Sequence, residues 1–497
     1  MPFVLAVISL DAVARPLIDR MINAGRLPHL AALLRRGTTH PMKTTPVHAS
    51  IYRSLYTGFS MATHGVHYPM QWSASRQRVV PADALKQEDT IFGRLDRAGR
   101  RMLVIDPPEC GRLAPQHGMV ISGWQFTTRF VLPRWYSSPA IAKGLERQFG
   151  PARSCNEVFG QPSTVHLRTI HEVLADAPRR LVAGAAACLK AGAFDVVWLT
   201  FVAAHIGGHQ LWRASLDAPP AANGADPQLL AHLYENVDDA IGQLMTILPP
   251  SSDVIVFSAN GMGAETSCAD LLPAMLARIL ARGSRPRAGS TSPMWRLRTA
   301  LPTTLRARVA DLMTDRTALE VAARLETIGV NWTRTRAFAP PSDGPGFVRV
   351  NLQGRERDGI VPAAAAQALL EEIQSGLETF VDASGERVVA SITRPTELDG
   401  KGPNVHALPD LIVEWTNKPV AGLRAVASPK FGDVRRNGVG SGRSGNHPGA
   451  TWATVIPGGS RRSVPRCDSA TAMDLAATIC SVMGVDHTDL PGRSLLQ

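Results

Sequence analysis

The feature that most constrains the fold of this chain is a series of short apolar runs separated by segments with helical periodicity. The runs include FVLAVISL at 3–10, RMLVIDPP at 101–108, FDVVWLTF at 194–201 and SDVIVFS at 252–258. Near-continuous apolar runs of this length are typical of strands buried on both faces of a parallel sheet. The segment at 229–248 has its apolar residues at helical spacing instead. This alternation predicts an α/β fold with a mostly parallel sheet.

The alternation is interrupted in the middle of the chain, which predicts an inserted smaller lobe. Within the interruption, FVRVNLQGRERDGIV and ERVVASITRP have the β-rich character of a small α+β unit. The alternation resumes at PDLIVEW, which begins at residue 409, and the chain closes with the helical segment SATAMDLAATICSVMGV. We therefore expect a core built from residues 1–263 and 401–497, with residues 264–400 as the inserted lobe.

The net charge bears on the class of binding partner, and the cysteines bear on the cellular compartment. The formal net charge is +11, and the arginines are scattered without a long basic block, so we expect a small anionic partner and no nucleic acid. The six cysteines are widely spaced and form no CxxC pair, which favours free thiols in a reducing compartment. No apolar run reaches the ~18 residues of a membrane span, and the apolar start of the chain lacks a basic region and a cleavage site. We expect a cytoplasmic protein that does not bind a membrane.

Polar side chains follow several of the predicted strands. Asp11 follows the first apolar run, His205 and His209 follow the third, and Asn260 follows the fourth. In open parallel sheets, ligands bind beyond the carboxyl ends of the strands. These side chains are therefore expected to meet in one crevice.

The histidine pair in TFVAAHIGGHQLW admits two interpretations. On spacing alone, two histidines four residues apart are more often ordinary core or solvent-facing residues than metal ligands. The position of His205 and His209 directly after a buried strand favours ligation. Asp11, taken alone, is also compatible with capping the helix that follows it.

GRLPHLAALLRRG and SLYTGFSMATHGV lie near the start of the chain, VNWTRTRAFAPPSDGPGFVRVNLQGRERDGIV in its middle and DLAATICSVMGVDHTDLPGRSLL at its end. In this order, the segments resemble the opening, the smaller lobe and the C-terminal helix of the type I phosphodiesterase/nucleotide pyrophosphatase family of the alkaline phosphatase superfamily. The resemblance implies an alkaline-phosphatase-like α/β/α sandwich with an inserted lobe. It also implies two metal ions, usually zinc, that clamp a phosphoryl group beside a Thr or Ser nucleophile.

The family pattern is retained in one metal pocket. Asp11 matches the aspartate after the first strand, and His209 matches a histidine ligand, supported by Trp212 in the same pattern. His447, in SGNHPGATWATVIPGG, matches the late histidine ligand, whereas His205 falls where the family has aspartate. The resemblance thus implies a pocket of three histidines for one divalent ion, with Asp11 as a ligand in the neighbouring pocket.

The family pattern is lost at the second metal and at the nucleophile. SANGMG stands where the family has an Asp-His pair, so Ala259 and Asn260 replace two ligands. Alanine cannot coordinate and asparagine offers only a neutral oxygen, so a second tightly bound ion is not expected. Counting back from the TG of SLYTG, the nucleophile position falls on His48, and Thr44 or Thr45 would take it only after a shift of register.

Three functional classes fit this altered site. We expect the first, a metal-dependent, hydrolase-like enzyme that acts on a phosphoester or related small anion with one divalent ion, Zn²⁺ before Fe²⁺ or Cu²⁺. In it, His48 and Asp11 are the catalytic residues, with His48 in proton transfer beside Asp11, while Asn260 and Arg129 contact the substrate. The second class is a pseudoenzyme that keeps the fold and binds a ligand or partner. The third is a non-hydrolytic enzyme, redox or lyase, on the same histidines.

Overall fold

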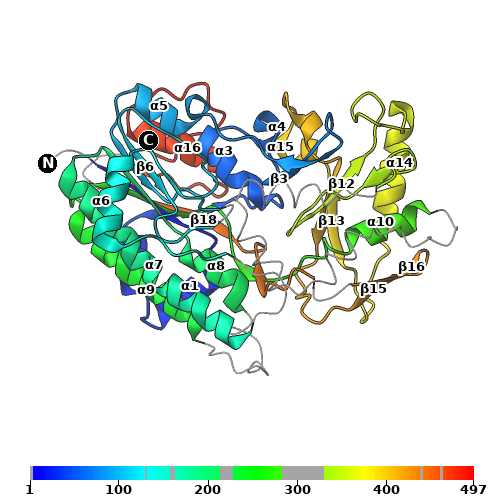
Figure 1. Ribbon diagram of the computed structural model, residues 1–497, viewed down its shortest axis with the longest axis horizontal. Helices are drawn as coiled ribbons and strands as arrows, with labels where there is room; N and C mark the ends of the chain where they lie inside the picture. Colours follow the sequence, from blue (N-terminus) through cyan, green and yellow to red (C-terminus); the bar gives the residue numbers. More distant parts are fainter. Residues whose placement is uncertain are drawn as a thin grey trace.

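The described part of the chain forms a large core, in which a sheet lies between two layers of helices, and a smaller lobe beside it (Figure 1). The computed structural model describes residues 4–128, 131–156, 163–212, 228–281, 330–436, 440–458 and 463–496. Both ends of the chain lie on the core (Figure 1).

An eight-stranded mixed sheet forms the centre of the core. Its strands are β1 (Leu5–Leu10), β2 (Thr38–Met42), β5 (Met102–Ile105), β6 (Gly118–Ser122), β7 (Trp135–Tyr136), β8 (Val196–Phe201), β9 (Asp253–Ser258) and β18 (Thr451–Ile456). Their order is β2-β18-β9-β1-β8-β5-β6-β7. The five inner strands β9, β1, β8, β5 and β6 run parallel. The outer strands β18, β2 and β7 pair in the antiparallel sense.

The central strand β1 confirms that three of the apolar runs are neighbours in one sheet. It pairs in parallel with β8 on one side and with β9 on the other, so that Ile8 faces Leu199 and Val256. Every residue of these three strands is buried. Helices cover both faces of the sheet, which explains why the strands read as continuous apolar runs rather than alternating ones. The predicted α/β/α sandwich is confirmed.

Helices pack on each face of the sheet and divide the apolar residues into two cores. One face is covered by α1 (Arg15–Asn23), α2 (Pro28–Arg35), α7 (Thr164–Ala191), α8 (Ala203–Leu211) and α9 (Leu229–Ile247), with α6 (Pro139–Phe149) packed on α7. The other face is covered by α3 (Ile51–Thr57), α5 (Ile91–Arg97) and α16 (Ala472–Val482). Successive β1 residues serve the two cores in turn, Ala6 and Ile8 the first, Leu5 and Val7 the second.

The smaller lobe is built on a four-stranded antiparallel sheet in the order β11-β12-β14-β13. These strands are β11 (Ala337–Phe338), β12 (Gly346–Val350), β13 (Val389–Thr393) and β14 (Leu411–Trp415), and α10 (Leu272–Leu280) and α14 (Ala363–Leu377) pack on them around a separate core. Trp72 brings a hairpin from the first part of the chain to this lobe, because its ring packs on Trp332 and Phe338.

The remaining elements are short connections and ribbons. The ribbons are β3 (Met70–Ser73) with β4 (Arg78–Pro81), β10 (Gly263–Ala264) with β17 (Gly445–Asn446), and β15 (Ala425–Ser428) with β16 (Gly432–Arg435). The short helical turns are η1 (His48–Ser50), α4 (Met61–His64), η2 (Gln87–Asp89), α15 (Pro395–Asp399) and η4 (Val405–Ala407). The turn η1 and the ribbon β10–β17 matter most here, because they deliver residues to the candidate site.

One predicted strand lies in a different sheet. The run PDLIVEW was expected to return the chain to the core, and this expectation is wrong, because β14 pairs with β12 and β13 in the lobe. The chain rejoins the core sheet only at β18. A continuous apolar run shows that a strand is buried but does not show which sheet buries it. The division into residues 1–263, 264–400 and 401–497 stays a prediction.

Two further observations concern membrane-spanning helices and the state of the cysteines. No helix in the described ranges is long and apolar enough to cross a membrane. Five of the six cysteines are buried, and no disulfide joins any of them in the part of the chain that the structure describes.

Candidate metal centre and anion pocket

The candidate site lies where the carboxyl ends of β1, β8 and β9 meet. Asp11 follows β1, and its backbone N–H donates to the Phe201 carbonyl at the end of β8 (3.0 Å). Helix α8 begins at Ala203, directly beyond β8, and carries two histidines one turn apart. Six residues expected from the sequence line one cavity of about 230 Å³: Asp11, His48, His205, His209, Asn260 and His447.

Three imidazole rings converge in this cavity. Nε2 of His205 lies 3.0 Å from Nε2 of His209, and the candidate ligand atoms of His205, His209 and His447 all lie within 4.8 Å of one another. Two nitrogen ligands of a tetrahedral zinc ion are about 3.3 Å apart, given Zn–N distances near 2.0 Å. The spacing and chemistry of the three side chains therefore fit one divalent ion.

Hydrogen bonds to the opposite ring nitrogens orient the imidazoles. Nδ1 of His209 donates to the Gly445 carbonyl (2.8 Å), and Nδ1 of His447 donates to the Gly261 carbonyl (3.0 Å). A carbonyl only accepts, so the proton is on Nδ1 and the lone pair of each ring is on Nε2. Burial lowers the pKa of both side chains well below the ordinary value, helped by neighbouring positive groups, which keeps the rings neutral as ligation requires.

Asp11 lies behind the histidines rather than among the convergent ligand atoms. Its Oδ2 accepts from Nδ1 of His205 (2.7 Å) and its Oδ1 accepts from the Tyr52 hydroxyl (2.7 Å). The side chain is fully buried, and the group of candidate ligands found in the described residues does not include it. Metal-binding histidines commonly donate their other nitrogen to a carboxylate. The geometry thus gives Asp11 the position of the partner that fixes His205.

Among the described residues, the neighbouring pocket has no second set of three candidate ligands. Ala259 is fully buried and has no coordinating atom, and the Asn260 amide lines the cavity. Within the described ranges, the three histidines are the candidate ligand group at this cavity. The donor set fits one ion and not two.

His48 is packed between the histidine cluster and the inserted lobe. Its ring centroid lies 4.5 Å from that of His447. A Cβ added to Gly344 would lie 2.3 Å from Cε1 of His48, so the lobe leaves no room for a larger residue there. Nε2 of His48 lies 3.8 Å from Oδ1 of Asp343. The expected partner was Asp11, but the carboxylate that the structure places beside His48 is Asp343.

The two threonines that precede His48 lie between β2 and η1. Neither Thr44 nor Thr45 is among the described residues that line the cavity. The Thr45 hydroxyl accepts the Val47 backbone N–H (3.3 Å) in the turn that leads into η1. This geometry supports the register that places His48 where the family has its hydroxyl nucleophile.

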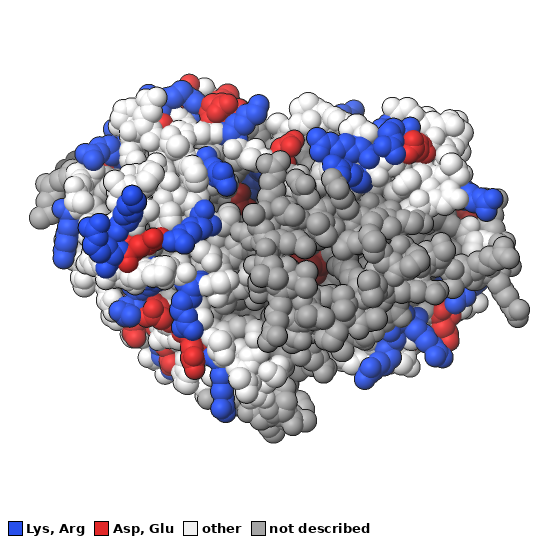
Figure 2. All heavy atoms as spheres, in the orientation of Figure 1, with Lys and Arg blue, Asp and Glu red and all other residues white. Residues whose placement is uncertain are grey.

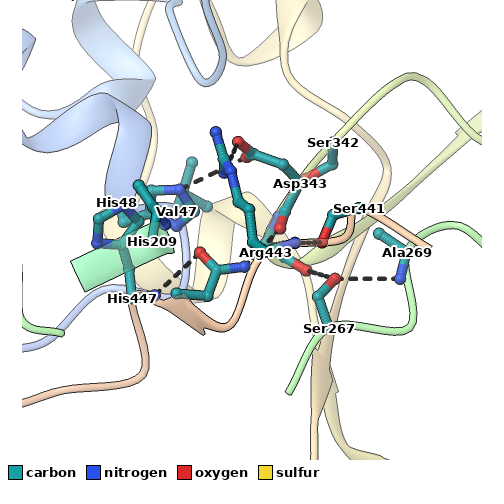
Figure 3. Close-up of polar contacts among 12 residues, drawn as sticks. Val47, His48, His209, Ser267, Ala269, Ser342, Asp343, Ser441, Arg443 and His447 are labelled. Carbon is teal, nitrogen blue, oxygen red and sulfur yellow. Dashed lines mark hydrogen bonds and ion pairs between the residues drawn. The ribbon is translucent and has the colours of Figure 1, made fainter. Parts of the chain in front are cut away.

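Asp343 and Arg443 also line the cavity, and neither was expected there from the sequence. Nη1 of Arg443 donates to Oδ2 of Asp343 (2.6 Å), and Nδ2 of Asn446 donates to the Asp343 carbonyl (2.6 Å). Figure 3 shows Asp343 linked to His48 on one side and to Arg443 on the other. Burial alone would raise the pKa of Asp343, but Arg443 and His48 hold it well below its usual value.

This ion pair joins the lobe to the core at the cavity. Asp343 lies in the lobe between β11 and β12, and Arg443 lies just before β17. The arginine expected at the pocket was Arg129, which lies outside the described residues. Among the described residues, Arg443 is the arginine that lines the cavity, and a guanidinium group suits the geometry of carboxylates and phosphates.

Replacing Asp343 with asparagine should make inorganic phosphate bind about 5-fold more tightly, because Arg443 loses its counter-charge, an effect of about 1 kcal/mol. Isothermal titration calorimetry at fixed pH measures this affinity. The control variant Asp270→Asn removes a comparable carboxylate, which pairs with Arg436 at 2.7 Å and does not line the cavity. It should leave phosphate affinity unchanged. Weaker phosphate binding by Asp343→Asn would show that Asp343 mainly holds the loop in place.

The fold and the converging histidines define an alkaline-phosphatase-like α/β protein with a candidate site for one divalent ion. The chain belongs to the type I phosphodiesterase / nucleotide pyrophosphatase family, whose model matches residues 5–416. The resemblance seen in the sequence is therefore confirmed. Among curated proteins, none matches this chain.

Solved structures share the fold at low identity. Phosphonoacetate hydrolase from Sinorhizobium meliloti 1021, in complex with phosphonoformate, is 14% identical with a TM-score of 0.50, over 96% of this chain and 94% of its own. The complex with phosphonoacetate is 13% identical with a TM-score of 0.51 over the same shares. Human ectonucleotide pyrophosphatase / phosphodiesterase 5 is 10% identical with a TM-score of 0.46, over 99% of this chain and 96% of its own. At these identities the first two structures show a common fold.

Proposed function

We propose that this protein is a metal-dependent, hydrolase-like enzyme that acts on a phosphoester or a related small anion. One divalent ion is held by His205, His209 and His447, and His48 replaces the hydroxyl nucleophile of the family. The observation that carries the proposal is the convergence of three imidazoles whose Nδ1 atoms all hydrogen-bond to fixed acceptors. A protein that had simply lost its activity would not be expected to gain a third histidine, His205, at the site. It would also not be expected to hold that histidine in place through a hydrogen bond to Asp11.

The donor set favours zinc. Three imidazole ligands suit Zn²⁺, with Fe²⁺ and Cu²⁺ as alternatives. A divalent ion at this position supplies a Lewis acid, which polarises a phosphoryl oxygen and lowers the pKa of water. Asp11 contributes by fixing the ring orientation of His205.

The chain's own groups bind the substrate and move a proton. The Arg443 guanidinium faces the cavity from a nearly buried position, with 9% of its side chain exposed, and binds the anionic end of the substrate. Asn260 offers an amide N–H to a substrate oxygen, and Arg129 is proposed as a further anion contact. His48 holds and transfers a proton at Nε2, the atom that faces Asp343.

The substrate class follows from what the pocket keeps and what it has lost. The two phosphonoacetate hydrolase structures contain small phosphonates, and the cavity here is small, at about 230 Å³. Ordinary phosphodiester cleavage in this family requires a hydroxyl nucleophile and a second metal, and the described residues of the site offer neither that hydroxyl nor a second group of three metal ligands. A small phosphoester or phosphonate therefore fits better than a nucleic acid.

We also propose a cytoplasmic location, because the buried thiols suit a reducing compartment.

Metal analysis of the purified protein, followed by a hydrolysis screen, tests the proposal. We expect about one tightly bound zinc per chain, and turnover of small phosphoesters or phosphonates that a chelator abolishes. A bound redox metal with no hydrolysis would favour the non-hydrolytic alternative. No metal after supplementation, together with no turnover, would favour a pseudoenzyme that binds a ligand or partner.

Turnover of a generic aryl phosphodiester is expected to be poor. In the family mechanism, an activated side-chain hydroxyl attacks a substrate such as bis(4-nitrophenyl) phosphate, and His48 stands where that hydroxyl is expected. Spectrophotometric assays with the metal-loaded protein measure the rate, and mass spectrometry checks for a covalent intermediate. Efficient cleavage with a phosphothreonine trapped at Thr44 or Thr45 would show that the assignment of His48 is wrong.

A further inference from the structure

Glu109 differs from the other charged residues of the cavity because its carboxylate has no partner there. Asp11 accepts from Tyr52 and His205, and Asp343 is paired with Arg443. In the part of the chain that the structure describes, no hydrogen bond or ion pair involves the Glu109 carboxylate, although the residue lines the cavity. A partly buried carboxylate is solvated less well than an exposed one, so a cationic ligand would supply the partner that the protein does not.

The backbone holds Glu109 in an unfavourable conformation that aims its side chain. Its φ is +55°, in the left-handed region that a residue with a Cβ rarely adopts. The conformation is fixed by the Glu109 N–H, which donates to the Val131 carbonyl (3.0 Å). At the start of the same loop, the buried Asp106 carboxylate accepts the backbone N–H groups of Trp124 (2.8 Å) and Gln125 (2.9 Å). Hydrogen bonds therefore hold the loop at both residues, and it keeps a glutamate in a backbone conformation that glycine adopts without strain.

The surroundings of Glu109 suit a cation better than an anion. Burial raises the pKa of Glu109 to about 7; Asp11 and Asp343 act in the same direction, while His205 and Arg53 oppose them. Arg53 shares a neighbouring cavity with Glu109 and donates to the Asp83 carbonyl (2.5 Å), but it does not line the cavity of the three histidines. On the cavity side, the walls include the rings of Tyr52 and Tyr68 and the Met70 thioether. Aromatic rings and a carboxylate together favour an ammonium group.

We propose that Glu109 forms a subsite for a cationic group of the substrate, so that the pocket selects a zwitterion. The inference rests on the proposed function in one respect, since it places the anionic end of the substrate at Arg443 and the three histidines. The ammonium group then lies at Glu109, next to the tyrosines. The substrate class becomes a small phosphoester or phosphonate that carries an amine.

Two probes of equal shape test this subsite by binding alone. 2-Aminoethyl phosphate and propyl phosphate share their anion and differ only in an ammonium group in place of a methyl group. Isothermal titration calorimetry with the wild-type protein should show at least about 10-fold tighter binding of the amine. Glu109→Gln should reduce this preference to less than about 2-fold and leave propyl phosphate affinity unchanged, because it removes the charge and keeps the shape.

Two further variants make the result decisive. Glu88→Gln removes an exposed carboxylate that lines a different cavity, and it should keep the full preference for the amine. Glu109→Gly relieves the positive φ, so it should melt no lower than the wild type and yet lose the preference. Equal binding of the two probes by the wild type, or a preference that survives in Glu109→Gln, would overturn the subsite. If the wild type binds no metal but still prefers the amine, that result would contradict the proposed function and would still support the subsite at Glu109.

Discussion

His209→Ala is expected to abolish the tight binding of the divalent ion. Nε2 of His209 lies 3.0 Å from Nε2 of His205, and Nδ1 of His209 donates to the Gly445 carbonyl, so the ring is fixed with its lone pair toward His205. Even residues that only orient a ligating histidine contribute 10-fold to 100-fold to metal affinity, so loss of a ligand should weaken binding by more than about 100-fold. Metal content should fall from about one ion per chain to almost none. Elemental analysis after gel filtration measures this, and added Zn²⁺ should raise the Tm of the wild type but not that of His209→Ala.

Three control variants separate this site from general damage. Asn260→Ala should hardly change metal content, because a neutral amide is a weak ligand and the second pocket lacks partners. His29→Ala alters the other group of possible ligands, where the Asp238 carboxylate instead accepts the backbone N–H groups of His29 (3.1 Å) and Leu30 (2.7 Å). It should have no effect on metal content. Asp11→Asn should weaken metal affinity by about 10-fold to 100-fold, as expected for a residue that orients a ligand.

The result can also contradict the assignment. Two ions per chain in the wild type would mean that the neighbouring pocket binds metal despite Ala259 and Asn260. Full metal content in His209→Ala would show that the ion binds somewhere other than at the three histidines. Complete loss of metal in Asp11→Asn would give Asp11 the role of a direct ligand, as the family pattern implies.

Most of the core could be predicted from the sequence, because a strand that is buried on both faces has a recognisable, continuously apolar sequence. Strands β1, β8 and β9 are covered on both faces, so each reads as a continuous apolar run, and their order in the chain suffices to suggest a parallel sheet. The assignment of β14 was wrong for the same reason, because its pattern of burial resembles that of a core strand. Pairing partners depend on contacts between distant segments, which apolar periodicity does not encode.

Residues at strand ends were predictable, whereas residues brought by the lobe were not. Asp11, His205 and Asn260 follow β1, β8 and β9, and the sheet itself makes them neighbours. Asp343 lies in the segment that resembles the family's smaller lobe, but no feature of the sequence assigned it or Arg443 to the site, and the two residues meet because the lobe contacts the core. Glu109 could have been suspected from its position three residues beyond Asp106 in a proline-containing loop after β5, a strand of the same sheet. Its positive φ, however, is a property of the folded chain.

Replacing His48 should abolish most activity while preserving the fold and the metal. His48 packs on the His447 ring at a centroid distance of 4.5 Å and points Nε2 at Asp343, so it is held beside the anion pocket without being one of the three convergent ligands. A positioned proton donor or acceptor contributes about 10²-fold to 10⁴-fold to a reaction rate. His48→Ala and His48→Gln should therefore lose at least about 10²-fold in kcat on a substrate found in the hydrolysis screen.

The same position offers a test of why the family chemistry has changed. His48→Thr restores the family's nucleophile type, yet it should not create a phosphodiesterase, because Ala259 and Asn260 still provide no second metal to activate the hydroxyl. The control His406→Gln removes an exposed imidazole outside the cavity and should keep full activity. Near-wild-type turnover by His48→Ala would reduce His48 to a packing residue. If His48→Ala loses the metal, His48 is a fourth ligand. The substitution would then have removed a bond to the ion rather than a group that transfers a proton.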